Sequence, residues 1–295
     1  MQIRTEWEML ELILGTARSD DRIRAVYMNG SRTNPNAGTD IMQDYDVVYV
    51  VKETGSFLAD ACWIKVFGDL IMLQEPDRMD MAAGREVGIS QSYGYLMLFT
   101  DGNRIDLHIE TQESMLDHYG CDSLTVPLLD KEGILPKISP SSDSMYHVKA
   151  PSEVRFQHVC NEFLWCQQNV AKGIWRKELP YAKNMAETIV RPMLDEMVSW
   201  WIGINREFGV STGKMGKYFG DYLPEEYWSM YKQTYADSNY ENMWQALFIM
   251  SDLFRFLGEA VAKYLNYCYP HKDDQAMTKY LMRIRSMPKD AKHIF

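Results

Sequence analysis

Three aspartates in two short apolar stretches carry the clearest chemical signal in this 295-residue sequence. Asp44 and Asp46 open the apolar run 44–51, and Asp106 lies inside the run 104–109. Because side chains alternate between the two faces of a strand, Asp44 and Asp46 project to one side, about 7 Å apart along the chain. The two carboxylates repel each other unless a cation lies beside them. Mg²⁺ prefers oxygen ligands and is often bound by carboxylates together with the phosphate groups of a substrate. The spacing predicts a metal site of the kind used in nucleotide transfer.

A Gly-Ser pair precedes these acids. Gly30 and Ser31 follow a predicted strand over 23–28, and twelve residues separate Ser31 from Asp44. Glycine lets the backbone approach a ligand closely, serine adds a hydroxyl donor, and the first turn of a helix favours anions. We expect this pair to meet phosphate groups.

Asp106 belongs to a predicted hairpin. Runs 95–100 and 104–109 are joined by Asp-Gly-Asn at 101–103, a strong turn signal. The apolar residues of the second strand share one face, expected to be the core face, and Asp106 lies on the other. A carboxylate in such a run disagrees with β-propensity, and such disagreements tend to mark function. The other two aspartates share its face if the strands are neighbours.

Apolar periodicity predicts a mixed first half and a second half that is helical almost throughout. Thr5 and Glu8 fit a capping box at the start of the first helix, and Pro192 is expected to kink or interrupt a long helix. The predicted strands cover 23–28, 44–51, 69–73, 95–100, 104–109 and 123–129, and the predicted helices cover 5–18, 56–66, 152–172, 178–208, 224–236, 239–267 and 273–286.

The segment 138–152 is rich in Ser, Pro and Asp, which is typical of a linker. We therefore expect two domains, an α/β domain over 1–140 and an α-helical domain over 150–295.

Charge and composition limit the binding partners that this protein can have. The formal net charge is −10, and the sequence has no Lys/Arg run of the kind that grips a phosphate backbone, so nucleic acid is a poor candidate partner. An acidic surface instead attracts cationic ligands.

No stretch approaches 18 consecutive apolar residues and residues 1–6 lead into no secretory segment, so we expect a cytoplasmic protein without a membrane partner. The five cysteines form no CxxC pair, which argues against disulfides and zinc.

Gly30-Ser31, Asp44-x-Asp46 and a later strand aspartate together resemble the signature of the DNA polymerase β-like nucleotidyltransferases. Within that superfamily the chain looks like the aminoglycoside 6-adenylyltransferases over 25–51, 161–165 and 213–218, so the similarity covers nearly its whole length. The resemblance implies an α+β fold, in which a nucleotidyltransferase domain with a mixed, helix-flanked sheet precedes an α-helical domain. It also implies Mg²⁺-dependent transfer of AMP from ATP to the 6-hydroxyl of streptomycin, with release of pyrophosphate and resistance to the antibiotic.

Roles for the donor side follow from this resemblance. Asp44 and Asp46 would hold Mg²⁺, and Asp106 would be either a third ligand or the general base for the sugar hydroxyl. Gly30, Ser31 and Arg32 would meet the phosphates of ATP. Candidate cations for the leaving pyrophosphate are Lys214 and Lys217, each of which has a solvated surface lysine as its alternative, and more weakly Lys183.

Acceptor recognition calls for carboxylates and aromatic faces, because streptomycin carries guanidinium and ammonium groups. Glu162 and Trp165, one helical turn apart, are candidates for this pocket, although aromatic residues at helical spacing also fit core packing. Glu110 and Glu113 are further carboxylates close to Asp106.

Two alternatives stay open. One is a nucleotidyltransferase that acts on a protein or a tRNA end, which the second-half similarity disfavours. The other is a non-catalytic nucleotide-binding module, which predicts loss of a carboxylate or of the Gly-Ser pair, and none is lost.

Overall fold

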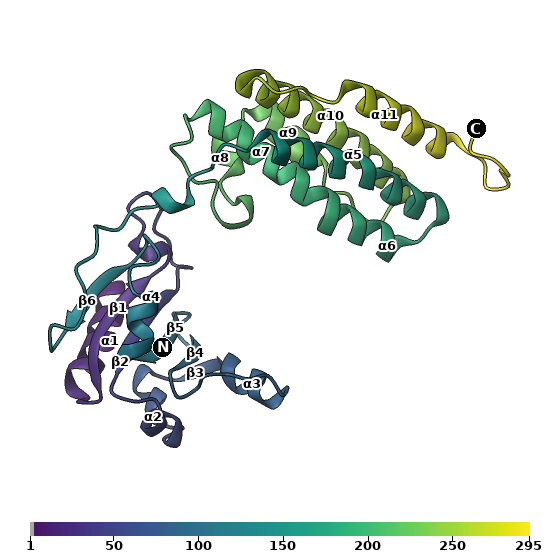
Figure 1. Cartoon of the computed structure of the whole chain (residues 1–295). Coiled ribbons are helices and arrows are strands. Elements are labelled where there is room, and N and C mark those ends of the chain that lie inside the picture. Colours follow the sequence, from purple (N-terminus) through teal and green to yellow (C-terminus); the bar gives the residue numbers. More distant parts are fainter. Residues whose placement is uncertain (1–2) are drawn as a thin grey trace. The chain divides into compact units, whose positions relative to one another are not determined.

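The computed structural model describes residues 3–295 and shows two compact units (Figure 1). The first unit ends at Met145, and the second runs from Tyr146 to Phe295. The first unit contains a helix-flanked sheet and the second is α-helical, which confirms the predicted α+β class.

The sheet of the first unit has six strands in the order β3-β4-β5-β2-β1-β6. The pairing of β2 with β5 is parallel, and the other neighbours are antiparallel. The strands are β1 (Ile23–Asn29), β2 (Tyr45–Val51), β3 (Leu70–Gln74), β4 (Ser92–Phe99), β5 (Arg104–Thr111) and β6 (Val126–Asp130). The parallel pair lies at the centre of the sheet and consists of the two strands that carry the aspartates.

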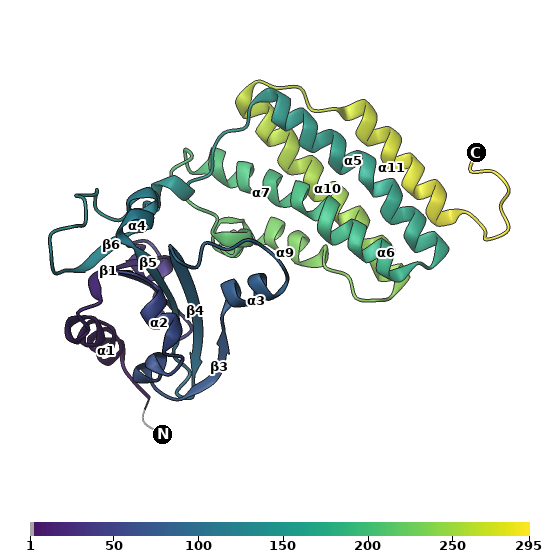
Figure 2. The ribbon, with the colours of Figure 1, turned by 60° about the horizontal axis from the view of Figure 1, so that its bottom comes forward.

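Helices cover the two faces of this sheet (Figure 2). Apolar side chains of α1 and α2 pack on one face with the alternate residues of the strands, and α4 packs on part of the other. The helices are α1 (Glu6–Ser19), α2 (Gly55–Ala59), α3 (Pro76–Ala82) and α4 (Gln112–His118). The face that α4 covers only in part is the face on which Asp46 and Asp106 project.

The amino-terminal segment is fastened to the β4–β5 turn. Thr5 and Glu8 form the predicted capping box of α1. Just before it, Arg4 donates to Asp101 from Nε at 2.5 Å and from Nη2 at 3.0 Å. The hydrogen bonds from Arg4, together with those from Asn103, hold the pKa of the Asp101 carboxyl well below its usual range.

One predicted helix in this unit was wrong, and two helices were not predicted. The segment 56–66 forms α2 and a separate 3₁₀ helix, Trp63–Phe67. The chain breaks between them because the Asp60 carboxylate accepts a hydrogen bond from the Cys62 N–H at 3.0 Å, a local bond that competes with the helix. The helices missing from the prediction are α3 and α4, each of seven residues and too short for a clear period.

The second unit is a helical bundle in which α5, α7, α10 and α11 lie side by side (Figure 2). Its core includes a stacked pair, Phe163 and Phe254, with ring centroids 3.7 Å apart. Among residues 3–295, no helix combines the length and apolar character needed to span a bilayer. The helices are α5 (Glu153–Arg176), α6 (Leu179–Asn184), α7 (Arg191–Asn205), α8 (Phe219–Tyr222), α9 (Glu225–Gln233), α10 (Tyr240–Leu265) and α11 (His271–Ser286).

The expected irregularity near Pro192 is a widened turn. A π-helical segment, Met185–Val190, connects α6 to α7, and Pro192 occupies the first turn of α7. Proline offers no N–H for the preceding turn and its ring crowds the carbonyl four residues earlier, which a wider turn accommodates.

The Arg4–Asp101 contact makes stability depend on pH. Because the pKa of Asp101 is lower in the folded state, its ion pair stabilises the fold above the unfolded pKa of about 4 and is lost as the pH falls. We expect Asp101→Asn to lower the free energy of unfolding by about 2 kcal/mol at pH 7 in urea denaturation. The deficit shrinks below about pH 4. Glu11→Gln, which breaks an exposed pair with Arg18, is the control and stays within about 0.5 kcal/mol. A deficit of equal size at pH 3 and pH 7 contradicts this account.

Candidate active site

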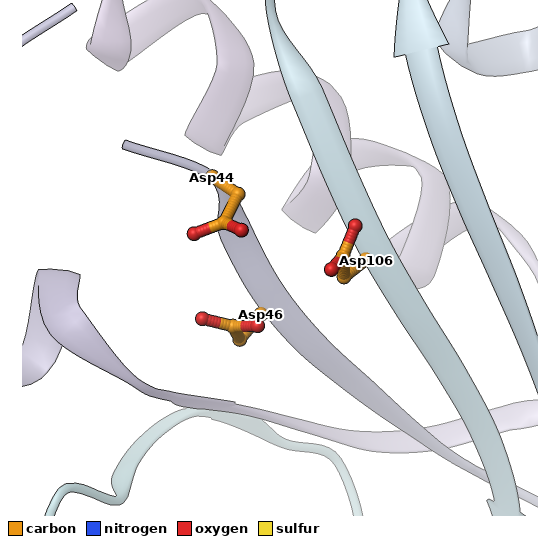
Figure 3. Close-up of side chains that lie close together, drawn as sticks. All are labelled: Asp44, Asp46 and Asp106. Atoms are coloured by element: carbon orange, nitrogen blue, oxygen red, sulfur yellow. The ribbon is translucent and has the colours of Figure 1, made fainter. Parts of the chain in front are cut away.

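The three predicted aspartates come together at one end of the β2–β5 pair. In the parallel register of these strands Asp46 lies directly opposite Asp106, and Asp44 immediately precedes β2. One carboxylate oxygen from each of the three lies within 4.8 Å of the others (Figure 3). All three side chains are partly buried, so solvent screens their mutual repulsion only in part.

The side chain of Arg104 already neutralises part of the negative charge of the three aspartates. The Arg104 guanidinium donates to both oxygens of Asp106, at 2.7 and 2.5 Å, and lies 3.8 Å from an oxygen of Asp44. The hydrogen bond to Asp106, followed by the charges of Asp44 and Asp46, raises the pKa of Arg104 above its usual value. Oxygen-only ligands gathered this closely, with a positive group drawn to them, fit a hard divalent cation such as Mg²⁺.

Gly30 is required by the position of Asp46. Its backbone has φ +79° and ψ −157°, a region that only glycine adopts readily. A Cβ on Gly30 would lie 2.1 Å from Oδ2 of Asp46, which is closer than any real contact. The turn places Ser31 at the start of a 3₁₀ helix, Ser31–Thr33. The Thr33 hydroxyl lies 2.9 Å from the Gly30 carbonyl oxygen and 2.7 Å from that of Leu124, and it can donate its one hydrogen to either.

Arg32 holds the segment that leads into β2. Its guanidinium donates to the carbonyl oxygens of Asp44 at 2.9 Å and Gln43 at 2.8 Å. It also lies 3.8 Å from the Tyr45 ring centroid and pairs with Glu6 at 3.3 Å. In this structure Arg32 therefore positions the backbone of Asp44, while its expected contact with phosphate stays a prediction.

A cleft of about 520 Å³ opens on the acidic face of the sheet. Gly30, Asp46 and Asp106 line it together with residues from further along the strands and from α4. The other residues that line it are Tyr27, Asn29, Val47, Val48, Ser92, Leu96, Leu107, His108, Glu110, Ser114, His118 and Asp122.

The candidate lysines belong to the second unit. Lys214 begins a 3₁₀ helix, Lys214–Gly216, and both Lys214 and Lys217 are exposed. The Lys217 ammonium lies 5.0 Å from the centroid of the Tyr218 ring. Lys183, on α6, donates to the carbonyl of Ala236. Their assignment to phosphate stays a prediction.

The two acceptor candidates on α5 have different surroundings. Trp165 is 63% exposed and lines a groove of about 600 Å³ with Tyr280, Phe295 and Asp273. Glu162 does not line that groove, and its carboxylate accepts the Cys166 thiol hydrogen at 3.3 Å. Burial, followed by this bond to Glu162, raises the pKa of Cys166 to about 11.

Sequence reasoning did not select Arg104 as a functional residue. The signal was present, because Arg104 stands two residues before Asp106 on the same strand and so shares its face. The partial cover of the cleft by α4 was also missed, since that helix was not predicted.

The mixed sheet, the Gly-Ser turn and the clustered carboxylates are the features that the resemblance to the nucleotidyltransferases implies. The family model described as streptomycin adenylyltransferase matches residues 3–284. This chain belongs to that family, which confirms the resemblance seen in its motifs, and it is therefore an enzyme that transfers a nucleotidyl group.

Curated relatives extend along nearly the whole chain. An aminoglycoside 6-adenylyltransferase of Campylobacter jejuni is 37% identical over 95% of this chain and 96% of its own length. The enzyme of the same name from Bacillus subtilis strain 168 is 36% identical over 94% of this chain and 97% of its own. A crystal structure of an aminoglycoside 6-adenyltransferase from Bacillus subtilis aligns with 32% identity and a TM-score of 0.48, covering 96% of this chain and all of that one.

Replacing Gly30 tests the turn. We expect Gly30→Ala to lower kcat by about 10²-fold or more, because the added methyl displaces the Asp46 carboxylate. Steady-state kinetics of nucleotidyl transfer measure the effect. Gly84→Ala is the matched control, since Gly84 has φ +80° but its Cβ would meet nothing within 4 Å. Equal losses in the two variants would show that backbone strain, and not the contact with Asp46, limits turnover.

Replacing Arg32 separates its two roles. Arg32→Lys keeps the charge but loses the planar fork that holds two carbonyls. We expect the Mg²⁺ concentration for half-maximal activity to rise about 10-fold, with little change in KM for ATP. Arg18→Lys, at an exposed position of α1, is the control. A raised KM for ATP with unchanged Mg²⁺ dependence would assign Arg32 to the phosphates instead.

Proposed function

We propose that this enzyme transfers AMP from ATP to the 6-hydroxyl of streptomycin or a closely similar aminoglycoside. The hydroxyl oxygen forms a bond to the α-phosphorus while its proton passes to solvent water, the bond from that phosphorus to the β-phosphate oxygen breaks, and pyrophosphate leaves. The observation that carries the proposal is the cluster of Asp44, Asp46 and Asp106 beside the Gly30 turn, in a chain whose relatives are named aminoglycoside 6-adenylyltransferases.

The acids hold the metal in this proposal. Asp44, Asp46 and Asp106 would hold it, because one oxygen of each lies within 4.8 Å of the others. When bound, Mg²⁺ supplies positive charge to the phosphate oxygens of ATP and to the attacking oxygen. The Arg104 guanidinium donates to both oxygens of Asp106, so it would have to release this carboxylate for Asp106 to hold the metal.

The Gly-Ser turn receives the triphosphate. Gly30 carries no side chain, so a phosphate can approach the backbone beside Asp46, and the Ser31 hydroxyl donates to it. Lys214 and Lys217 are the candidate cations for the leaving pyrophosphate, whose negative charge calls for positive partners. Lys183 is a weaker member of this set, because its ammonium must leave the Ala236 carbonyl.

The acceptor is recognised through its positive charges. The formal net charge of −10 steers a polycation toward the protein. The helical unit contributes Trp165, whose exposed ring offers a face to a guanidinium, and Glu162 as a carboxylate partner. ATP as the donor fits a cytoplasmic reaction.

Incubation of the protein with ATP, Mg²⁺ and a panel of aminoglycosides tests the proposal. The expected result is pyrophosphate release that depends on streptomycin, with the drug gaining the mass of one adenylyl group. Modification of other aminoglycosides only would overturn the choice of acceptor. No modification of any of them would overturn the function.

Replacing Asp46 tests the assignment of the aspartates as metal ligands. We expect Asp46→Asn to lower kcat by about 10³-fold or more, because one anionic ligand of the metal is lost. Thermal stability should be retained, since the change also relieves repulsion among the acids. Asp117→Asn, at an exposed position on α4, is the control for a loss of negative charge. Full turnover by Asp46→Asn would remove the metal assignment.

A further inference from the structure

Glu110 is a buried carboxylate within the cleft that holds the catalytic acids. It stands four residues after Asp106 on β5, so both side chains project from the same face of the sheet. At about 3.3 Å per residue, the two positions lie roughly 13 Å apart along the strand. A molecule of several linked rings can span that distance, with one end at Asp106 and the other over Glu110.

The partners of Glu110 leave its charge uncompensated. Its carboxylate accepts hydrogen bonds from the Tyr27 hydroxyl at 2.5 Å and from the Ser114 hydroxyl at 3.0 Å. Only 3% of the residue is exposed, and it forms no ion pair with any residue in the part of the chain that the structure describes. A carboxylate offers about four acceptor positions, and buried charges are normally paired.

The rest of the cleft wall favours a positive ligand at this point. Four of the lining residues are acids, Asp46, Asp106, Glu110 and Asp122, and none is Lys or Arg. In the proposed function, Asp46 and Asp106, at the end of the cleft beside Gly30, hold the metal that faces the phosphates of ATP. Glu110 is further along, beside Tyr27, His118 and Ser114, where that chemistry does not extend.

We propose that Glu110 determines acceptor specificity, by binding an ammonium or guanidinium group of the aminoglycoside at the end of the cleft remote from the Gly30 turn. This inference rests on the proposed function. The hydroxyls of Tyr27 and Ser114 fix the carboxylate in place, and the cation of the acceptor supplies the charge that these hydroxyls lack. Pairing there holds the acceptor while its hydroxyl reaches the α-phosphorus near Asp46 and Asp106.

The test variant is Glu110→Gln, which keeps the shape and an oxygen acceptor for Tyr27 or Ser114 but removes the charge. We expect KM for the aminoglycoside to rise about 10- to 100-fold, the range of one lost charge-assisted hydrogen bond, while KM for ATP changes less than about twofold. Binding of the aminoglycoside measured by calorimetry without ATP should weaken by the same factor. Asp117→Asn, which changes an exposed carboxylate on α4 that does not line the cleft, is the control and should leave both constants unchanged.

A purely structural role gives a different pattern. Glu110 also ties β1, β5 and α4 together, so Tyr27→Phe serves as a second variant that loosens this connection but keeps the charge. Unchanged acceptor binding in Glu110→Gln, or an equal rise in both KM values, overturns the inference. Tyr27→Phe keeps the charge and one of the two hydroxyl donors, so its acceptor defect should be smaller than that of Glu110→Gln. If the wild-type enzyme modifies no aminoglycoside, the proposed function itself fails. If it does, and Glu110→Gln binds the acceptor normally, only this inference fails.

Discussion

Repulsion among three carboxylates is the constraint around which the first unit is organised. Parallel pairing of β2 with β5 sets Asp46 opposite Asp106, and the start of β2 adds Asp44, so one oxygen of each comes within 4.8 Å of the others. Folding offsets the cost of this arrangement with core packing on the opposite face of the sheet. Only a cation makes the cluster itself favourable, and Arg104 already supplies part of the charge that is needed.

The contacts around the cluster determine where each acid points. Gly30 leaves room for the Asp46 carboxylate, and Arg32 holds the backbone of Asp44. Both belong to the one turn between β1 and β2, so the same few residues would shape the phosphate contact and aim two of the metal ligands. Because the same few residues serve both purposes, the spacing between the Gly-Ser pair and the aspartates is informative in the sequence.

Much of this was predictable because strand alternation and turn chemistry act locally. The β4–β5 hairpin follows from Asp101-Gly102-Asn103, and the capping box of α1 from Thr5 and Glu8. The pairing of β2 with β5 could only be expected through the shared chemistry of their acids, since no local signal specifies which strands become neighbours. The contacts of Arg32 were out of reach for the same reason, because a long flexible side chain selects its partners only after the strands are placed. Arg104 was within reach, since it stands two residues before Asp106 on the same strand. The short helix α4, which covers part of the cleft beside Glu110, lacked enough turns to show a period.

The most direct measurement is anomalous diffraction from crystals of the protein grown with Mn²⁺, as a substitute for Mg²⁺, and a non-hydrolysable ATP analogue. The account predicts an anomalous peak at about 2.1 to 2.3 Å from carboxylate oxygens of Asp44, Asp46 and Asp106, with the Arg104 guanidinium withdrawn from Asp106 and a phosphate beside Gly30. A peak elsewhere, or a nucleotide bound while Arg104 still pairs with Asp106 and no metal lies among the three acids, would contradict it.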